Sequence, residues 1–440
     1  MSKYDVASGI SQTCLNQILT DLYNNPIAKT KLFSYSGKEN VDGVGEVDIS
    51  FELKLAPTTI LLAPSQAKWN QAINPNKTPI PTSNAFQVSF PDINGSVIID
   101  GASPLAGHGE LEIYGVLNID LNKVSLQMEA VYLDESSFTA WDKVIVNKVL
   151  VPKALEMANK LLSGIPIPEI PEFEGISFET PVISIVNQQI VAATILKGNG
   201  APDLSGYTYT GGNGIYIKTN SNPINSVLYQ YNGKTENTED RKGPSGWYAA
   251  GKASVTINSL KLDITSNISA VVDIKQATAM GEIGGAGVGI TKAILCPVGA
   301  AVDAMSNPKN WDKVIASFKI TYTPDPIKSV LTLGLSGNKV KISVGTVNSI
   351  HIIAQPTWSG SVTGSALAAA SSALVDMIPK QLQTLIVNKV ITDNLQNMSV
   401  YTLPELSKTI EGINVTVIPN DGNLIVSGNY AEEGLTVKIN

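Results

Sequence analysis

The sequence predicts an α+β fold of two pseudo-symmetric domains, each a highly curved antiparallel sheet wrapped along one long helix. Two observations lead to this prediction. The segment 151–196 returns in altered form near the C-terminus, which is typical of a duplicated domain. Both halves also contain many runs in which apolar and polar residues alternate, the pattern of strands with one buried face.

The repeated segment is defined by three short signatures that occur in the same order in both copies. In the first copy they are Val-Pro-Lys-Ala-Leu at 151–155, Ile-Pro-Glu-Ile at 167–170 and Glu-Gly-Ile at 174–176. In the second copy they are Ile-Pro-Lys-Gln-Leu at 378–382, Leu-Pro-Glu-Leu at 403–406 and Glu-Gly-Ile at 411–413. Chance could supply one proline match, but hardly the ordered set. We therefore expect a first domain at 1–197 and a second at 198–440.

Composition allows a large core and argues against several classes of function. The 440 residues are 43% apolar and 16% charged, with a mean hydropathy of +0.10, so two folded domains are expected rather than a disordered chain. The net charge of −7 is concentrated in residues 1–197, which hold 13 Lys against 21 acidic residues. Arg241 is the only arginine. Because nucleic-acid grooves and phosphate clamps normally use arginine, we expect no nucleic-acid partner.

Targeting signals are not visible in the sequence. The start, Met1–Asp5, lacks the apolar core of a conventional signal peptide. The longest apolar run, 293–302, is interrupted by a proline and a glycine, and it is shorter than the roughly 20 residues of a transmembrane span. We expect a soluble protein, either cytoplasmic or secreted without a cleavable signal. Cys14 and Cys296 lie in different halves, so we expect two separate buried thiols, with one bridge between the halves as the alternative.

Periodicity locates the elements of the first half. Apolar residues at helical spacing predict a first helix at 6–23. A long second helix is expected from about Thr139, and Pro152 should kink it or mark a restart. Alternating patterns predict strands at 47–55, 86–90, 96–99, 110–121, 124–133, 176–186 and 190–196.

The second half repeats this order and adds a glycine-rich segment. A short helix is expected at 223–231, a polar loop at 232–247 and a long helix at 365–390. Residues 276–312 contain several glycines but neither Gly-Lys-Ser/Thr nor Gly-x-Gly-x-x-Gly, so we expect a mobile loop and no phosphate site. Strands are expected at 253–257, 260–264, 268–274, 318–322, 330–335 and 340–344, and two more end the chain.

Residues that could carry chemistry are few and scattered. His108 and His351 lie in different halves, and Cys14 falls on the apolar face of the first expected helix, so we expect no enzyme. Glu110 and Glu112 alternate with apolar residues, which favours a solvated strand face. The sequence has no Cys-x-x-Cys, no His-x-x-x-His and no calcium loop, so neither a metal nor a cofactor is expected.

These features together resemble a known family. The opening helix with Ile10-Ser11-Gln12 and Leu15, and the Pro-Lys-x-Leu helix followed by Pro-Glu and Glu-Gly-Ile, resemble the tubular lipid-binding (TULIP) superfamily, specifically its bactericidal/permeability-increasing-protein-like members. The resemblance covers the whole chain in the order of its elements. Those members have a basic first domain and a signal peptide. In this chain the first half is acidic and no signal peptide is visible, so the resemblance does not imply lipopolysaccharide binding. Among bacterial proteins, the chain is similar to the accessory proteins encoded beside clostridial neurotoxins, which have a similar length.

The resemblance and the apolar helix stripes predict a non-catalytic protein that binds lipid, such as a fatty-acyl chain, or another apolar ligand in elongated hydrophobic grooves. The sequence leaves one alternative open, namely a structural or protein-interaction accessory component of a bacterial toxin complex with a filled core and no ligand. The residues expected to line the grooves are the apolar positions of the helices: Ile10, Cys14, Ile18, Leu22, Val144, Val151, Leu155, Leu162, Val227, Leu228, Leu374, Ile378, Leu382 and Leu385.

Overall fold

The computed structural model describes most of the chain. The residues outside the described part are 1–2, 42, 44, 54–56, 66–68, 73–83, 100–103, 121–122, 133–138, 164, 166, 168, 210, 213, 244–246, 286–311, 363–364, 404–405 and 421–423. Strand exceeds helix, and every described strand register is antiparallel, as in the predicted α+β class. None of the described helices is both long and apolar enough to cross a bilayer.

The first sheet is formed by strands from the first half of the chain. They are β2 (Ser34–Val41), β3 (Gly45–Leu53), β4 (Thr59–Leu62), β5 (Ala85–Ile99), β6 (Leu105–Asp120) and β7 (Lys123–Tyr132). Their order is β2-β3-β5-β6-β7, with β4 beside β5. The register shifts once between β5 and β6, after Phe90, and once between β6 and β7, at Gly115. Such irregularities bend a strand and increase the local twist, which curls the sheet.

The helices associated with this sheet are α1 (Gln12–Asn24), α2 (Pro26–Leu32), α4 (Ala140–Ile145), the π-helix η1 (Val146–Leu150) and α5 (Val151–Ser163). The predicted interruption at Pro152 takes the form of the π-helical turn η1, which ends just before that proline. Proline has no N–H to continue the α-helical ladder, so a change of hydrogen-bonding pattern there is expected. Val149 of η1 packs with Val47, Ile49 and Val97, which anchors the helix on the sheet.

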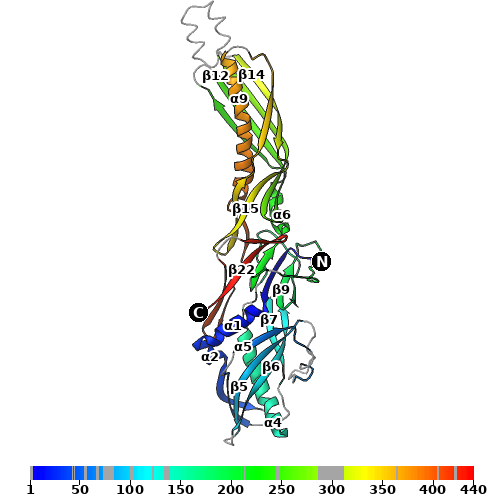
Figure 1. The fold of residues 1–440 in the computed structure, drawn as a ribbon, viewed down its shortest axis with the longest axis vertical. Helices are drawn as coiled ribbons and strands as arrows, with labels where there is room; N and C mark the ends of the chain where they lie inside the picture. The colour runs from blue at the N-terminus through cyan, green and yellow to red at the C-terminus, as the bar shows by residue number, and fades with distance from the viewer. Residues whose placement is uncertain are drawn as a thin grey trace, which may run out of the picture. The chain divides into compact units, whose positions relative to one another are not determined.

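A second sheet combines strands from both ends of the chain (Figure 1). Its strands are β1 (Val6–Ser11), β8 (Val182–Val186), β9 (Gln189–Thr194), β10 (Ile215–Thr219), β19 (Leu406–Ile410), β20 (Ile413–Pro419), β21 (Ile425–Ser427) and β22 (Tyr430–Ile439). Their order is β19-β20-β22-β10-β1-β9-β8, with β21 beside β22. The N-terminal strand therefore lies in the interior of this sheet.

The expected helix at 6–23 is wrong over its first six residues. Val6–Ser11 form β1, which is paired on one side with β9 and on the other with β10. The helix begins at Gln12 because the Ser11 side chain caps it, accepting a hydrogen bond from the Cys14 N–H at 3.2 Å. Backbone hydrogen bonds to β9 and β10 favour a strand here more than the helical spacing of the apolar residues favours a helix. Sequence periodicity carries no information about such long-range pairing.

The third sheet belongs to the second half of the chain. Its strands are β11 (Thr235–Lys242), β12 (Trp247–Ile264), β13 (Ile268–Gly285), β14 (Asp312–Thr323), β15 (Ile327–Ser336), β16 (Lys339–Val347), β17 (His351–Trp358) and β18 (Ser399–Thr402). Their order is β11-β12-β13-β15-β16-β18, and β14 pairs with β13 and β17. The expected glycine-rich loop at 276–312 is strand as far as Gly285, and residues 286–311 lie outside the described part.

The expected polar loop at 232–247 is also wrong, because Thr235–Lys242 form the strand β11 at the end of this sheet's order. All of its side chains are polar or charged, so the strand has no apolar face that an alternating pattern could reveal. Charged and polar residues are typical of edge strands, where they discourage pairing with another chain. Backbone pairing with β12 from Thr235 to Lys242 therefore decides the conformation.

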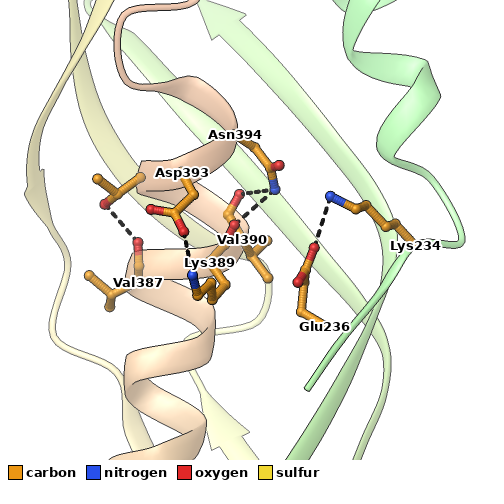
Figure 2. A network of polar contacts seen from close by, with 8 residues as sticks. Lys234, Glu236, Val387, Lys389, Val390, Asp393 and Asn394 are labelled. Atoms are coloured by element: carbon orange, nitrogen blue, oxygen red, sulfur yellow. Dashed lines mark hydrogen bonds and ion pairs between the residues drawn. The ribbon is translucent and has the colours of Figure 1, made fainter. Parts of the chain in front are cut away.

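The helices of the second half are α6 (Ser221–Leu228), the 3₁₀-helix η2 (Tyr229–Tyr231), α9 (Ser365–Thr384), the π-helix η4 (Leu385–Thr392) and α10 (Asp393–Leu395). Figure 1 shows α9 running beside β12, and α9 also contacts β13 and β17. Side chains donate hydrogen bonds to three backbone carbonyl groups of η4 (Figure 2). Asn394 Nδ2 donates to the oxygens of Lys389 and Val390 at 2.9 and 3.0 Å, and Thr392 Oγ1 donates to that of Val387. These bonds stabilise a helical form that is rare in proteins.

The chain divides into two compact units. Unit 1 comprises residues 1–220, 337–339 and 401–440, and unit 2 comprises residues 221–336 and 340–400. The expected domain boundary between residues 197 and 198 lies within unit 1. The duplication stays a prediction. Gly175 and Gly412 both lie in turns with positive φ, 74° and 82°, but the two Glu-Gly pairs differ, since Glu411 also has a positive φ, 51°, and Glu174 does not.

Candidate functional site

The predicted lining residues nearest the N-terminus are buried but do not lie on one helix. Ile10 is fully buried in β1, where it pairs with Ile190 on one side and Ile215 on the other. Ile18 and Leu22 are buried in α1. Burial of this kind fits a filled core and a closed groove equally well, so a role in ligand binding stays a prediction for these residues.

Cys14 is a free, partly buried thiol in α1. Burial, together with the charge of Asp21, raises the pKa of the Cys14 thiol to about 11. The thiolate is the nucleophilic form of cysteine, so at neutral pH this side chain is held in its unreactive form. The side chain of His108 and the whole of Cys296 lie outside the described part of the chain.

The predicted residues of the long helix in the first half fall into two groups. Val151, Leu155 and Leu162 are buried in α5. Val144 of α4 is 39% exposed and does not continue their stripe. The π-helical turn η1 lies between Val144 and Val151, and its wider turn rotates the preceding residues relative to the α5 stripe.

The predicted residues of the second half are also core residues. Val227 is partly buried and Leu228 fully buried in α6. On α9 and η4 the side chains of Leu374, Ile378, Leu382 and Leu385 are each no more than 1% exposed.

Two glycines of the third sheet bring α9 close to the backbone of its strands. A Cβ atom added at Gly251 would lie 2.9 Å from Cδ1 of Ile378, and one at Gly281 would lie 2.7 Å from Cδ1 of Leu374. Side-chain carbons do not approach so closely, so a larger residue at either position would force Leu374 or Ile378 to move. The side-chain amide of Gln381 also donates to the carbonyl oxygen of Gly251 at 3.2 Å. At this place the space between helix and sheet is filled.

A small apolar pocket lies in unit 1, between helices α2 and α5 and strands β5 and β6. Its volume is about 20 Å³. The lining consists of apolar residues only: Leu32, Phe33, Phe90, Ile93, Leu111, Ile113, Ala154 and Met157. None of them is among the predicted lining residues, although Ala154 and Met157 flank Leu155 in sequence. The pocket therefore opens beside the apolar stripe of α5 rather than on it.

The expected solvated pair of glutamates is only half correct. Glu110 is exposed, but Glu112 is 4% exposed and accepts a hydrogen bond from the Tyr114 hydroxyl at 2.9 Å. Tyr114 packs with Trp69 and Ala130, so this face of the sheet is covered by the segment that holds Trp69. Sequence alternation shows that one strand face is polar, but it does not show what covers that face.

Groups suited to metal binding are absent from the described residues, where no three His, Cys, Asp or Glu side chains gather around one point. His351 is exposed on β17.

Comparisons with known proteins give structural likenesses only. No family model matches the chain, and no curated protein matches it. A solved structure of lipopolysaccharide binding protein is similar at 12% identity and a TM-score of 0.38, over 99% of both chains. The structure of P47 from Clostridium botulinum A2 is similar at 12% identity and a TM-score of 0.40, over 98% of this chain and 96% of that one. Proteins of both kinds named by the sequence resemblance are thus found, but likeness at TM-scores of 0.38 and 0.40 and at 12% identity carries no argument about function.

Sequence reasoning missed a buried lysine in the second sheet. Lys218 of β10 is 5% exposed, and its Nζ lies 4.3 Å from the ring centroid of Tyr207 and between 5.1 and 5.7 Å from those of Tyr4, Tyr209 and Tyr430. Ring faces attract cations, which offsets part of the cost of burying the ammonium group. The sequence feature that could have revealed it is a single lysine within the mostly apolar run Ile-Tyr-Ile-Lys-Thr at 215–219.

The surroundings of Lys218 disfavour its charged form. Burial lowers the pKa of the Lys218 ammonium to about 8. The charge of Glu432, which pairs with Lys218 from the neighbouring strand β22, opposes that shift. The Tyr209 hydroxyl donates to Oε1 of Glu432 at 2.5 Å, and the hydroxyls of Tyr207 and Tyr216 share a hydrogen bond of 2.6 Å. The cluster is enclosed by its own side chains, so we assign it a structural role.

Proposed function

We propose that this protein is a non-catalytic binder of an apolar ligand, such as a fatty-acyl chain, and that the ligand enters unit 1 at the pocket between α2, α5, β5 and β6. The observation that carries the proposal is the lining of that pocket, which contains no charged or polar side chain. Burying a CH₂ group is worth about 0.8 kcal/mol relative to water, so such a lining favours apolar groups such as alkyl chains over polar or charged ligands.

The pocket as it stands accommodates the end of a chain, since its volume is about 20 Å³. A longer acyl chain requires neighbouring side chains to move. Met157 is suited to this, because an unbranched thioether adopts many conformations at little cost. Extension of the ligand along α5 would bring it beside Val151, Leu155 and Leu162, the residues that the sequence predicts.

The proposal includes the tubular arrangement, in which a curled sheet wraps along a long helix and the ligand lies between them. The packing of Val149 of η1 on the first sheet and the contact of α5 with β7 support this part of the proposal. Transfer of an acyl chain from a bilayer into such a tube gains almost nothing, because the chain was already in hydrocarbon. We therefore assign the protein to carrying or presenting a lipid rather than to extracting one.

The test is uptake of a fluorescent fatty acid by the full chain, paired with native mass spectrometry. Ala154→Leu fills the pocket, and we expect it to weaken uptake at least about tenfold, a change of about 1.4 kcal/mol. Ala373→Leu is the matched control, since Ala373 is also a partly buried helical alanine but lies on α9. A wild-type protein that takes up no fatty acid, or equal loss of uptake in both variants, would contradict the proposal.

For unit 2 we propose a structural role, which is the alternative that the sequence leaves open. The observation favouring it is the direct packing of Leu374 and Ile378 on glycine backbone, which leaves no space for a ligand there. In that case a fatty acid should photo-crosslink to residues of unit 1 only. Crosslinks to α9 would show instead that both units bind ligand.

A further inference from the structure

A second groove of unit 1 shares no lining residue with the pocket described above. It is lined by the proline-rich connector that precedes β8, by β8 itself and by β9, and its volume is about 490 Å³. Its apolar surface includes Pro171, Phe173, Phe178 and Ile183. A groove of this size accommodates one or two large side chains.

The apolar part of the groove is held in place by its neighbours. The Phe173 ring packs edge-on against Phe178, with centroids 5.3 Å apart, and its centroid lies 5.0 Å from that of Tyr401. The connector is fixed at Glu172, whose backbone exchanges two hydrogen bonds with that of Thr402, at 2.8 and 3.2 Å. Because these rings and this backbone are already ordered, a partner would bind without first having to order them.

The charged part of the groove is entirely acidic. Glu169, Glu172 and Glu179 line it, and no lysine or arginine does. Oε1 of Glu179 accepts a hydrogen bond from the Gly198 N–H at 2.7 Å, whereas the side chains of Glu169 and Glu172 meet no cation among the described residues. Lys197 lies near the groove, since its backbone N–H donates to Ser177 at 3.0 Å, but it is not part of the lining.

We propose that this groove docks an extended peptide segment of a partner protein, in which apolar or aromatic side chains are flanked by lysine or arginine. The apolar side chains fill the space beside Phe173 and Phe178, and the basic ones pair with Glu169 and Glu172. An acidic rim repels phosphate and carboxylate head groups, so charge selects a basic peptide over an anionic lipid. The proposal goes beyond the apolar-ligand function and uses none of the residues of the other pocket.

The experiment measures fluorescence anisotropy of a fluorescein-labelled peptide, Lys-Leu-Trp-Leu-Lys, added to the full-length protein. Glu-Leu-Trp-Leu-Glu and Lys-Ser-Ser-Ser-Lys serve as peptides that lack one of the two features. We expect only the first to bind, and we expect its binding to weaken with added salt, because rim charges are screened over about 8 Å at physiological ionic strength. The double variant Glu169→Gln/Glu172→Gln should bind it about tenfold more weakly.

Glu174→Gln is the matched control, because Glu174 is an exposed glutamate of the same segment that does not line the groove. It should leave peptide binding unchanged, and all of these variants should take up fatty acid as the wild type does. Equal binding of the basic and acidic peptides, or binding of none of them, would overturn the proposal. So would a loss of binding in Glu174→Gln as large as that in the double variant. Fatty-acid uptake lost in the rim variants would assign the groove to the apolar ligand instead.

Discussion

Adjacent residues of β22 illustrate how one strand buries charge on both faces of a sheet. Successive strand residues point to opposite sides, so Glu432 faces the tyrosine cluster around Lys218, while Glu433 lies across from Ile217 on the other face. Glu433 is 3% exposed. Burial raises the pKa of its carboxyl group to about 7, although a hydrogen bond from the Asn420 backbone opposes the shift.

We expect the stability of the protein to fall as pH rises from about 4.5 to about 7, and Glu433→Gln to remove this contribution. In that range the native carboxyl retains its proton while the unfolded one has lost it, so unfolding releases a proton. The raised pKa corresponds to about 3 kcal/mol as an upper estimate. Urea unfolding in steps across this pH range measures the slope, with Glu174→Gln as the exposed control. Parallel curves for Glu433→Gln and the wild type would refute the assignment.

At the scale of elements, close approach between α9 and its sheet depends on a row of small residues. Gly251, Gly281 and Ala316 are aligned across β12, β13 and β14 by the strand registers. Leu374 and Ile378 of α9 rest on the two glycines. The apolar face of α9, which the sequence predicts, therefore packs on this row of small residues in the strands. No pattern within the helix sequence indicates that row.

Gly281→Ala should destabilise unit 2 by about 1–3 kcal/mol, because the added methyl group overlaps the buried side chain of Leu374. Gly212→Ala is the control, since a Cβ there meets no atom within 4 Å and the glycine does not need a positive φ. Urea unfolding midpoints compare the two variants. An unchanged midpoint for Gly281→Ala would mean that α9 shifts at no cost and that the helix–sheet space is not filled.

At the scale of the molecule, the second sheet joins sequence that the predicted domains would separate. β1 and β9 belong to residues 1–197, whereas β10 and β22 belong to residues 198–440. β1 is hydrogen-bonded to β9 on one side and to β10 on the other. Residues 215–219 of β10 are all buried, so neither predicted domain contains a complete version of this sheet.

We expect fragments 1–197 and 198–440, produced separately, to be aggregation-prone, because each exposes an unpaired interior strand. Produced together, they should associate into a stable complex with the circular dichroism spectrum of the intact chain. Size-exclusion chromatography and chemical unfolding distinguish the two outcomes. If fragment 1–197 alone unfolded cooperatively with the stability of the intact chain, the pairing of β1 with β10 would contribute little to the fold.

The sequence by itself determines the class of the fold and the position of its long helices, because those depend on periodicity that is local to each element. The stripe from Val151 to Leu162 and the one from Leu374 to Leu385 are read directly from spacing. Strand alternation likewise reveals most of the sheets. The apolar character of the predicted site follows from the same patterns.

Only the tertiary structure decides where long-range pairing or covering overrides a local pattern. β1 reads as helix but pairs with two strands far away in sequence, and β11 lacks an apolar face but pairs with β12. Glu112 reads as solvated but is covered by another segment of the chain. The apolar pocket and the acidic groove are formed by residues from several elements. The free energy of such contacts depends on partners distant in sequence, and a single-sequence pattern carries no information about those partners.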